Sequence, residues 1–283
     1  GFLGARANTN AVNGVTPAVS SSTANISLVS DSYFYDRGYT ISTTGSLAFT
    51  PNSNSVTNYC EWGGALSGAN FVGTGANSTS ALTINNLAGV TGLTIGKDVS
   101  TPANVTFSAA ASLIGPIVVY GGAINVNQDL ASTASGAGIL LKGSGNVSLA
   151  SGKKITTNGG DVTFWADSNG DGSGYAQLYT NASVSTSGGS ITMGGGSNIA
   201  TGYARGEATR DMDSDPTYTL YIAGVNLRAG SSLTSSGGNI TLRGQNVNTS
   251  ANAMAFGVFM KDSVIDSGAG KISITGVATG SGS

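Results

Sequence analysis

Residues 155–164 read Ile-Thr-Thr-Asn-Gly-Gly-Asp-Val-Thr-Phe, and the same pattern returns three times further along the chain. The later copies are Val-Ser-Thr-Ser-Gly-Gly-Ser-Ile-Thr-Met at 184–193, Leu-Thr-Ser-Ser-Gly-Gly-Asn-Ile-Thr-Leu at 233–242 and Ile-Asp-Ser-Gly-Ala-Gly-Lys-Ile-Ser-Ile at 265–274. In every copy the apolar residue before the turn and the first apolar residue after it are seven positions apart. This repeat decides the fold.

Each copy reads as a short strand, a glycine turn and a second short strand. After the turn, apolar and polar residues alternate, which places one face of the strand in a core and the other in water. Strands this short cannot bury a core within one copy, so neighbouring copies must stack. The repeat therefore predicts an all-β solenoid with loop insertions. An antiparallel β-sandwich, which also has short strands and frequent turns, is the alternative.

The copies begin at residues 155, 184, 233 and 265, so extra coils or loops lie between them. With roughly 20 to 30 residues per coil, the chain is expected to form about ten to fourteen coils. We expect residues 81–283 to form the repeat solenoid, because the repeats align there. Residues 1–80 align poorly and are predicted to be an irregular or capping β region continuous with it.

The composition excludes several classes of function. Of 283 residues, 44 are Gly and 9% are charged, and the formal net charge is −2. The chain has no cluster of Lys and Arg residues, so nucleic acid is not expected as a partner. It also has no apolar run long enough to insert in a membrane. The chain contains no His and one Cys, which rules out His-based catalysis and Cys-based metal sites. The first residues lack the layout of a signal peptide, so we expect a processed form or an excerpt.

The repeats resemble those of filamentous haemagglutinin-like large bacterial exoproteins. The likeness rests on the copies above together with residues 92–97, 115–122 and 138–143, and it covers roughly residues 80 to 280. It implies a right-handed parallel β-helix, an extracellular location at the bacterial cell surface, and a role in adhesion or biofilm contact. Cell-surface glycans or proteins are then the expected partners.

The segment 167–173 resembles the first half of a calcium loop. Asp167, Asn169 and Asp171 place oxygen ligands at alternate positions, and Gly170 and Gly172 permit a sharp turn. The bidentate Glu that such a loop would have five residues after Ser173 is missing, because position 178 is Leu. Calcium is therefore the candidate ion, and no other cofactor is expected. The alternative is a polar turn, because Asn, Asp and Gly are ordinary turn residues.

A second candidate site lies between residues 203 and 218, where two repeat copies are farthest apart. Asp211, Asp213 and Asp215 are candidate ligands for a cation, and Arg205, Arg210 and Tyr218 are candidate contacts for a ligand such as a glycan. The alternative is a solvated insertion without a ligand. Asn residues recur beside the repeats, for example Asn146 and Asn239, and in stacked copies their amides could bond along the axis.

Three functions remain open on these grounds. An adhesive rod segment without catalysis fits the repeat and the resemblance. A self-assembling extracellular filament subunit uses the same rod, with neighbouring copies as partners. A polysaccharide-degrading β-helix enzyme needs paired carboxylates, and the chain has only 14 acidic residues, so we expect no enzyme.

Overall fold

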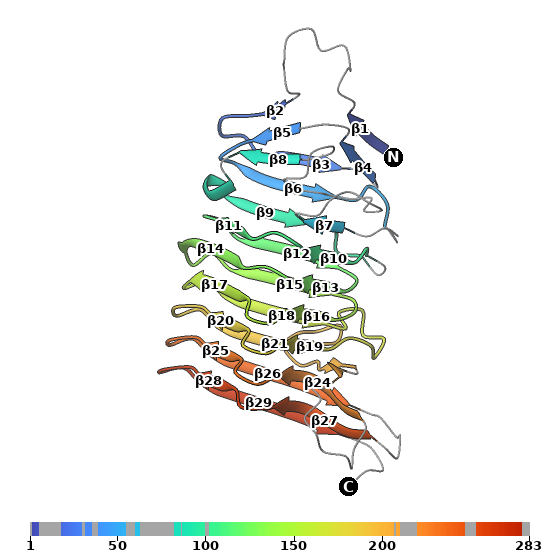
Figure 1. The fold of residues 1–283 in the computed structure, drawn as a ribbon, viewed down its shortest axis with the longest axis vertical. Helices are drawn as coiled ribbons and strands as arrows, with labels where there is room; N and C mark the ends of the chain where they lie inside the picture. The colour runs from blue at the N-terminus through green and yellow to red at the C-terminus, as the bar shows by residue number, and fades with distance from the viewer. Residues whose placement is uncertain are drawn as a thin grey trace.

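The computed structural model describes residues 2–5, 18–29, 32–35, 39–54, 60–62, 82–85, 87–99, 102–206, 208–209, 220–246 and 253–278. Strands stack along the long axis of a rod, with β2 near one end and β29 near the other (Figure 1). Apart from one short 3-10 turn, η1 (Leu87–Gly89), the regular elements of the described residues are strands. The chain is all-β with long parallel sheets, which is the arrangement of a β-solenoid.

Three long sheets form the sides of the rod. The ten-stranded sheet contains β3 (Ile26–Val29), β6 (Ser46–Thr50), β9 (Gly92–Ile95), β12 (Ile117–Gly121), β15 (Ile139–Gly143), β18 (Val162–Ala166), β21 (Ile191–Gly195), β22 (Ala204–Arg205), β26 (Ile240–Asn246) and β29 (Ile272–Ala278). The eight-stranded sheet contains β7 (Cys60–Trp62), β10 (Val105–Phe107), β13 (Ile124–Val126), β16 (Val147–Leu149), β19 (Ala176–Leu178), β23 (Ala208–Thr209), β24 (Leu220–Leu227) and β27 (Ala253–Met260). The six-stranded sheet contains β11 (Ala111–Leu113), β14 (Leu130–Ser135), β17 (Lys154–Asn158), β20 (Ser183–Ser185), β25 (Ser232–Thr234) and β28 (Val264–Asp266).

Two smaller sheets lie toward the amino-terminal end (Figure 1). One contains β2 (Ala18–Ser20), β5 (Tyr39–Ser42) and β8 (Leu82–Asn85), and the other contains β1 (Phe2–Ala5) and β4 (Ser32–Tyr35). Within residues 1–80, β3 and β6 pair in parallel and β6 pairs with β9, so the ten-stranded sheet extends into this region. The division of the chain at residue 80 stays a prediction.

From β11 onward, each coil visits the three long sheets in the same order. The chain runs from the six-stranded to the ten-stranded and then to the eight-stranded sheet, as in β17, β18 and β19. We call the three turns of a coil the glycine corner (six- to ten-stranded sheet), the loop corner (ten- to eight-stranded) and the closing corner (eight- to six-stranded). Among the described strands only β23 and β24 pair antiparallel. The parallel pairing elsewhere rules out the antiparallel sandwich.

The four repeat copies lie directly on top of one another. Ile155 pairs with Val184, Val184 with Leu233, and Leu233 with Ile265. Consecutive copies are therefore consecutive coils, and the residues between them form the eight-stranded-sheet strand of each coil together with loops. With the short β22 left aside, the ten-stranded sheet holds nine strands, one per coil. The expected total of about ten to fourteen coils for the whole chain stays a prediction.

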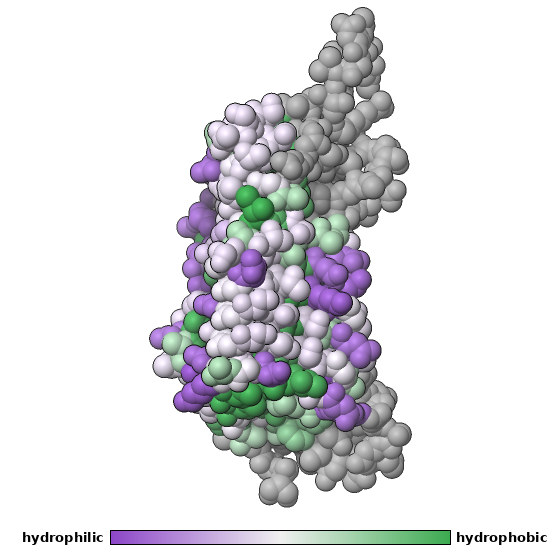
Figure 2. All heavy atoms as spheres, turned by 90° about the vertical axis from the view of Figure 1, so that its left-hand side faces the viewer, coloured by the Kyte–Doolittle hydropathy of each residue, from purple (hydrophilic) through white to green (hydrophobic). Residues whose placement is uncertain are grey.

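The apolar residues of each coil form continuous columns inside the rod. One column of the ten-stranded sheet consists of fully or almost fully buried side chains at successive coils: Leu47, Leu93, Ile117, Ile139, Val162, Ile191 and Ile240. Its next member, Ile272 in the last coil, is 43% exposed, and Ile274 is 45% exposed. Figure 2 shows hydrophobic side chains gathered at this end of the rod.

The glycine corner is fixed by a second column, which consists of buried hydroxyls. Ser132, Thr157, Thr186, Ser235 and Ser267 occupy this corner in successive coils, and all are 5% exposed or less. The Thr157 Oγ1 donates to the carbonyl oxygen of Gly160 at 2.5 Å, and the three hydroxyls that follow make the equivalent bond within their own coils. A glycine is required beside this bond, since a Cβ at position 189 would lie 2.1 Å from the Gly160 carbonyl oxygen.

Polar side chains at the end of the same corner connect neighbouring coils. Asp161 accepts a hydrogen bond from the backbone N–H of Ser190, Ser190 Oγ from that of Asn239, and Asn239 from that of Lys271. The predicted bonding of Asn residues along the axis is therefore present at Asn239. Its form is amide to backbone, which satisfies an N–H at a turn where the ladder is interrupted.

Candidate functional site at the loop corner

Insertions leave the rod through the loop corner in the stretch where the repeats are clearest. Two residues separate β12 from β13 there, and three separate β15 from β16. The connection runs from residue 167 to 175 between β18 and β19, and from 196 to 219 between β21 and β24. The glycine and closing corners of these coils stay short. The first candidate segment and the described start of the second, residues 203–206, therefore lie at one edge of the rod, in adjacent coils.

The first insertion, residues 167–175, is held down at both ends. The backbone N–H of Asp167 donates to the Gly145 carbonyl at 3.1 Å, and that of Ser168 donates to Gly143 at 2.9 Å. At the far end, the N–H of Tyr175 donates to Asn146 Oδ1 at 3.0 Å. These bonds continue the ladder of the coil below and fix the loop against it.

The three predicted calcium ligands lie together in this loop. Asp167 is fully buried, whereas Asn169 and Asp171 are exposed. Asp167 Oδ1 accepts from the N–H of Gly172 at 3.0 Å, and Asp171 Oδ1 accepts from the N–H of Ser173 at 2.9 Å. The Asn169 amide donates to Asp171 Oδ2 at 2.8 Å. The loop is thus an ordered turn with two neighbouring carboxylates.

Burial raises the pKa of Asp167 from its usual value of 3.8 to about 6. The hydrogen bond from the Gly172 N–H acts in the opposite direction, and the nearby Asp171 carboxylate raises the pKa further. Asp167 therefore titrates well above an ordinary carboxyl but is mostly ionised at neutral pH. Its burial keeps it out of reach of a polymeric substrate, so it is poorly placed to serve as a catalytic acid.

The second insertion lies directly against the first. Arg205 and Gly174 form an antiparallel bridge, in which the Arg205 N–H donates to the Gly174 carbonyl at 2.7 Å. Gly206 accepts from the Asn246 amide at 3.2 Å. The structure therefore joins the two candidate loops into one surface. Arg210, Asp211, Asp213, Asp215 and Tyr218 lie outside the described residues, so their predicted roles stay predictions.

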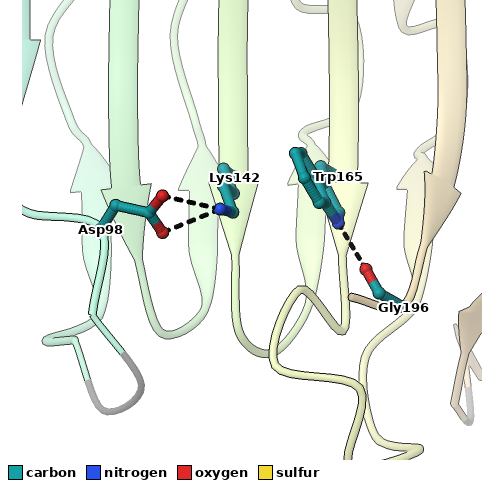
Figure 3. Close-up of polar contacts among 4 residues, drawn as sticks. All are labelled: Asp98, Lys142, Trp165 and Gly196. Atoms are coloured by element: carbon teal, nitrogen blue, oxygen red, sulfur yellow. Dashed lines mark hydrogen bonds and ion pairs between the residues drawn. The ribbon is translucent and has the colours of Figure 1, made fainter. Parts of the chain in front are cut away.

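Trp165 and Lys142 form a cluster beside these loops that the sequence analysis did not single out. Lys142 Nζ lies 4.3 Å from the centroid of the Trp165 ring and forms an ion pair with Asp98 at 2.8 Å (Figure 3). The Trp165 Nε1 donates to the carbonyl of Gly196 at 2.7 Å, so the indole anchors the start of the second insertion. A signal for the pair was present, because Lys142 and Trp165 hold the same register in successive coils.

A second cluster that sequence reasoning missed lies on the eight-stranded sheet. The Arg228 guanidinium lies 4.6 Å from the Tyr179 ring centroid, and burial raises the pKa of the nearby Tyr175. When the oxygen and nitrogen of the Gln177 side-chain amide are exchanged, which pairs donors with acceptors, the amide oxygen accepts a hydrogen bond from Arg228 Nε at 2.7 Å. Gln177 is almost fully buried, so this cluster fixes the base of the first insertion to the sheet.

Comparison of the chain with protein-family models, with curated proteins and with solved structures finds no match. Within the part of the chain that the structure describes, no three His, Cys, Asp or Glu side chains group to hold a metal ion. A metal at the first insertion would need amide, backbone or water oxygens besides the two carboxylates. None of the helices among the described residues has the length and apolar character needed to cross a membrane.

Proposed function

We propose that the chain is a rod segment of a large secreted bacterial cell-surface protein, in which the coils wind in a right-handed sense and the loop corner contacts a glycan or protein partner. The observation that carries this proposal is the arrangement of the two insertions. They project from adjacent coils, at one corner, from a scaffold whose interior is closely packed and fully buried. Binding residues gather on loops that a rigid scaffold positions.

The side chains available at this corner suit a carbohydrate or a polar protein surface. Trp165 and Tyr203 are half-buried aromatic residues, and Arg205 is a half-buried cation in the second insertion. Aromatic rings with a polar group combine apolar contact area with hydrogen bonding. The low charge of the chain supports neither nucleic acid nor a membrane as partner, and the proposal includes no catalysis.

A loop replacement tests this proposal. In register, Val147 and Val225 occupy equivalent positions, linked through Ala176. Replacing residues 196–224 with the short Ser-Gly-Asn turn of residues 144–146 should therefore remove the second insertion and keep the coil closed. We expect this variant to lose glycan-array and cell-surface binding while its circular dichroism and cooperative melting are preserved.

The matched control changes the opposite side of the rod. Thr156→Ala and Thr234→Ala lie on the outward face of the six-stranded sheet, far around the coil from the loop corner, and should leave binding intact. Unchanged binding by the loop replacement, or equal loss in the control, would contradict the proposed ligand surface.

One observation favours a second candidate, the self-assembling filament subunit. The last described coil leaves Ile272 43% and Ile274 45% exposed, where the same two columns are buried in the preceding coils. An uncovered coil with free strand edges can pair with another chain. Analytical ultracentrifugation separates the two functions, because concentration-dependent linear oligomers that disappear in Ile272→Lys would support the filament.

A further inference from the structure

Asp167 presents a buried oxygen that no protein group satisfies. Its side chain has no exposed surface, and while Oδ1 accepts from Gly172, Oδ2 is buried without a hydrogen-bond partner. Leaving a buried polar atom unpaired costs about 1–3 kcal/mol, and more when the group is charged. Such an atom in an otherwise ordered loop indicates that something completes the site.

The second carboxylate of the loop, Asp171, carries the same negative charge as Asp167. The Asp171 carboxylate lies close enough to raise the pKa of Asp167. Among the described residues, no Lys or Arg side chain forms an ion pair with either loop carboxylate, and the nearby Lys142 pairs with Asp98 instead. Two adjacent carboxylates without a counter-charge attract either a shared proton or a metal cation.

The side chains of this loop that could bind a cation offer oxygen atoms as ligands. The Asn169 amide lies within hydrogen-bond distance of Asp171, and a rotation of that amide would bring its oxygen to the same place. The chain contains no His, and the sole Cys is far away in sequence, so nitrogen and sulfur ligands do not contribute. Hard oxygen ligands on a turn of alternating Asp and Asn select calcium, which accepts six to eight such ligands including water.

We propose that Asp167 and Asp171 bind one calcium ion together, with the Asn169 amide oxygen and water completing its coordination. The ion neutralises both carboxylates and satisfies Asp167 Oδ2. Because the same loop bridges to Arg205 through Gly174, the ion also stiffens the ligand-contact surface of the second insertion. The site goes beyond the proposed adhesive function and stands independently of it.

Calorimetric titration of the EDTA-treated full chain with calcium chloride at pH 7.5, together with melting curves, tests this site. We expect one ion per chain, a Kd between about 10⁻⁴ and 10⁻³ M as in extracellular calcium modules, and a higher melting temperature. Asp167→Asn and Asp171→Asn should each weaken binding at least about tenfold. Asn tolerates the positive φ of 49° at position 167, so the first variant should fold and melt no lower than the parent in EDTA.

Asp98→Asn is the matched control, since it removes one carboxylate from a partly exposed ion pair near the same edge, and calcium binding should stay within about twofold. Three results would overturn the proposal. These are no heat and no melting shift in millimolar calcium, equal binding by all three variants, or magnesium binding as tight as calcium. The first would show that the carboxylates share a proton only, and the second would place the ion elsewhere.

Discussion

The hydroxyl column at the glycine corner makes a sharp prediction at Thr157. Thr157 and Thr156 are neighbours in β17, but they face opposite sides of the sheet. Thr157 is 5% exposed and its Oγ1 donates to the Gly160 carbonyl at 2.5 Å, with the Thr186 carbonyl of the next coil at 3.4 Å. Thr156 is exposed. Thr157→Val removes the hydroxyl without a change in shape, and Thr156→Val makes the same change on the outside.

The structure sets the expected magnitude. Thr157→Val deletes one hydrogen bond inside a coil and a weaker one between coils, and leaves the buried Gly160 carbonyl without this donor. The free energy of unfolding should fall by about 1–3 kcal/mol. Thr156→Val should change it by less than about 0.5 kcal/mol, because a surface hydroxyl exchanges its bond with water. Thr157→Ser keeps the hydroxyl and should recover most of the loss.

Guanidinium denaturation, monitored by far-ultraviolet circular dichroism, measures these differences. The slope of the transition should be the same for all variants, so that the shift in midpoint reports stability alone. Because each coil contacts only its neighbours, hydrogen exchange should also accelerate in the coils next to residue 157 more than at the ends of the rod. Equal midpoints for Thr157→Val and Thr156→Val would refute a stabilising role for the buried column.

Three further predictions follow from other contacts. Gly189→Ala puts a Cβ 2.1 Å from a backbone oxygen of the preceding coil and should cost more than about 2 kcal/mol, whereas Gly145→Ala, with its nearest neighbour at 3.5 Å, should cost under about 1 kcal/mol in the same denaturation assay. The pKa of Asp167 is about 6 in the folded state, against an ordinary value of 3.8, so between these pH values the folded state binds more protons than the unfolded state. In EDTA the melting temperature should therefore fall as pH rises from about 4 to 6 and then level off. Asp167→Asn should abolish this trend. Lys142→Met removes the cation at 4.3 Å from the Trp165 ring, which should alter the indole fluorescence and cost under about 1 kcal/mol, with a smaller cost in high salt.

The register of the core could be predicted from sequence because period-two alternation and the fixed seven-residue spacing act together. A slip by one residue would turn Val162 and Phe164 toward water, so the aligned copies had to stack as they do. The number of coils was not fixed by the sequence, because a gap between copies does not distinguish an extra coil from a loop. Residues 195 and 225 show the difficulty, since they close one coil although 29 residues separate them.

The candidate site could be predicted in part. The alternation of Asp and Asn identified Asp167, Asn169 and Asp171 as neighbours, because they are close in sequence. Sequence did not show that Asp167 is buried with one oxygen unpaired, since burial depends on the coil below, where Gly143 and Gly145 accept from the loop backbone. Contacts between distant residues are fixed only once the register is known.

The position of the insertions follows from how the other two corners are built. At the closing corner, successive coils place Gly152, Asn181, Gly230 and Asp262 in the left-handed region, with φ between 44° and 72°. The N–H groups of the first three each donate to a carbonyl of the next coil. An added residue there would break both the turn and this ladder, and at the glycine corner it would displace a buried hydroxyl. Among the described coils from β16 onward, the loop corner has no equivalent set of turn residues and hydrogen bonds, so it is where this part of the rod can gain a binding surface without losing a coil.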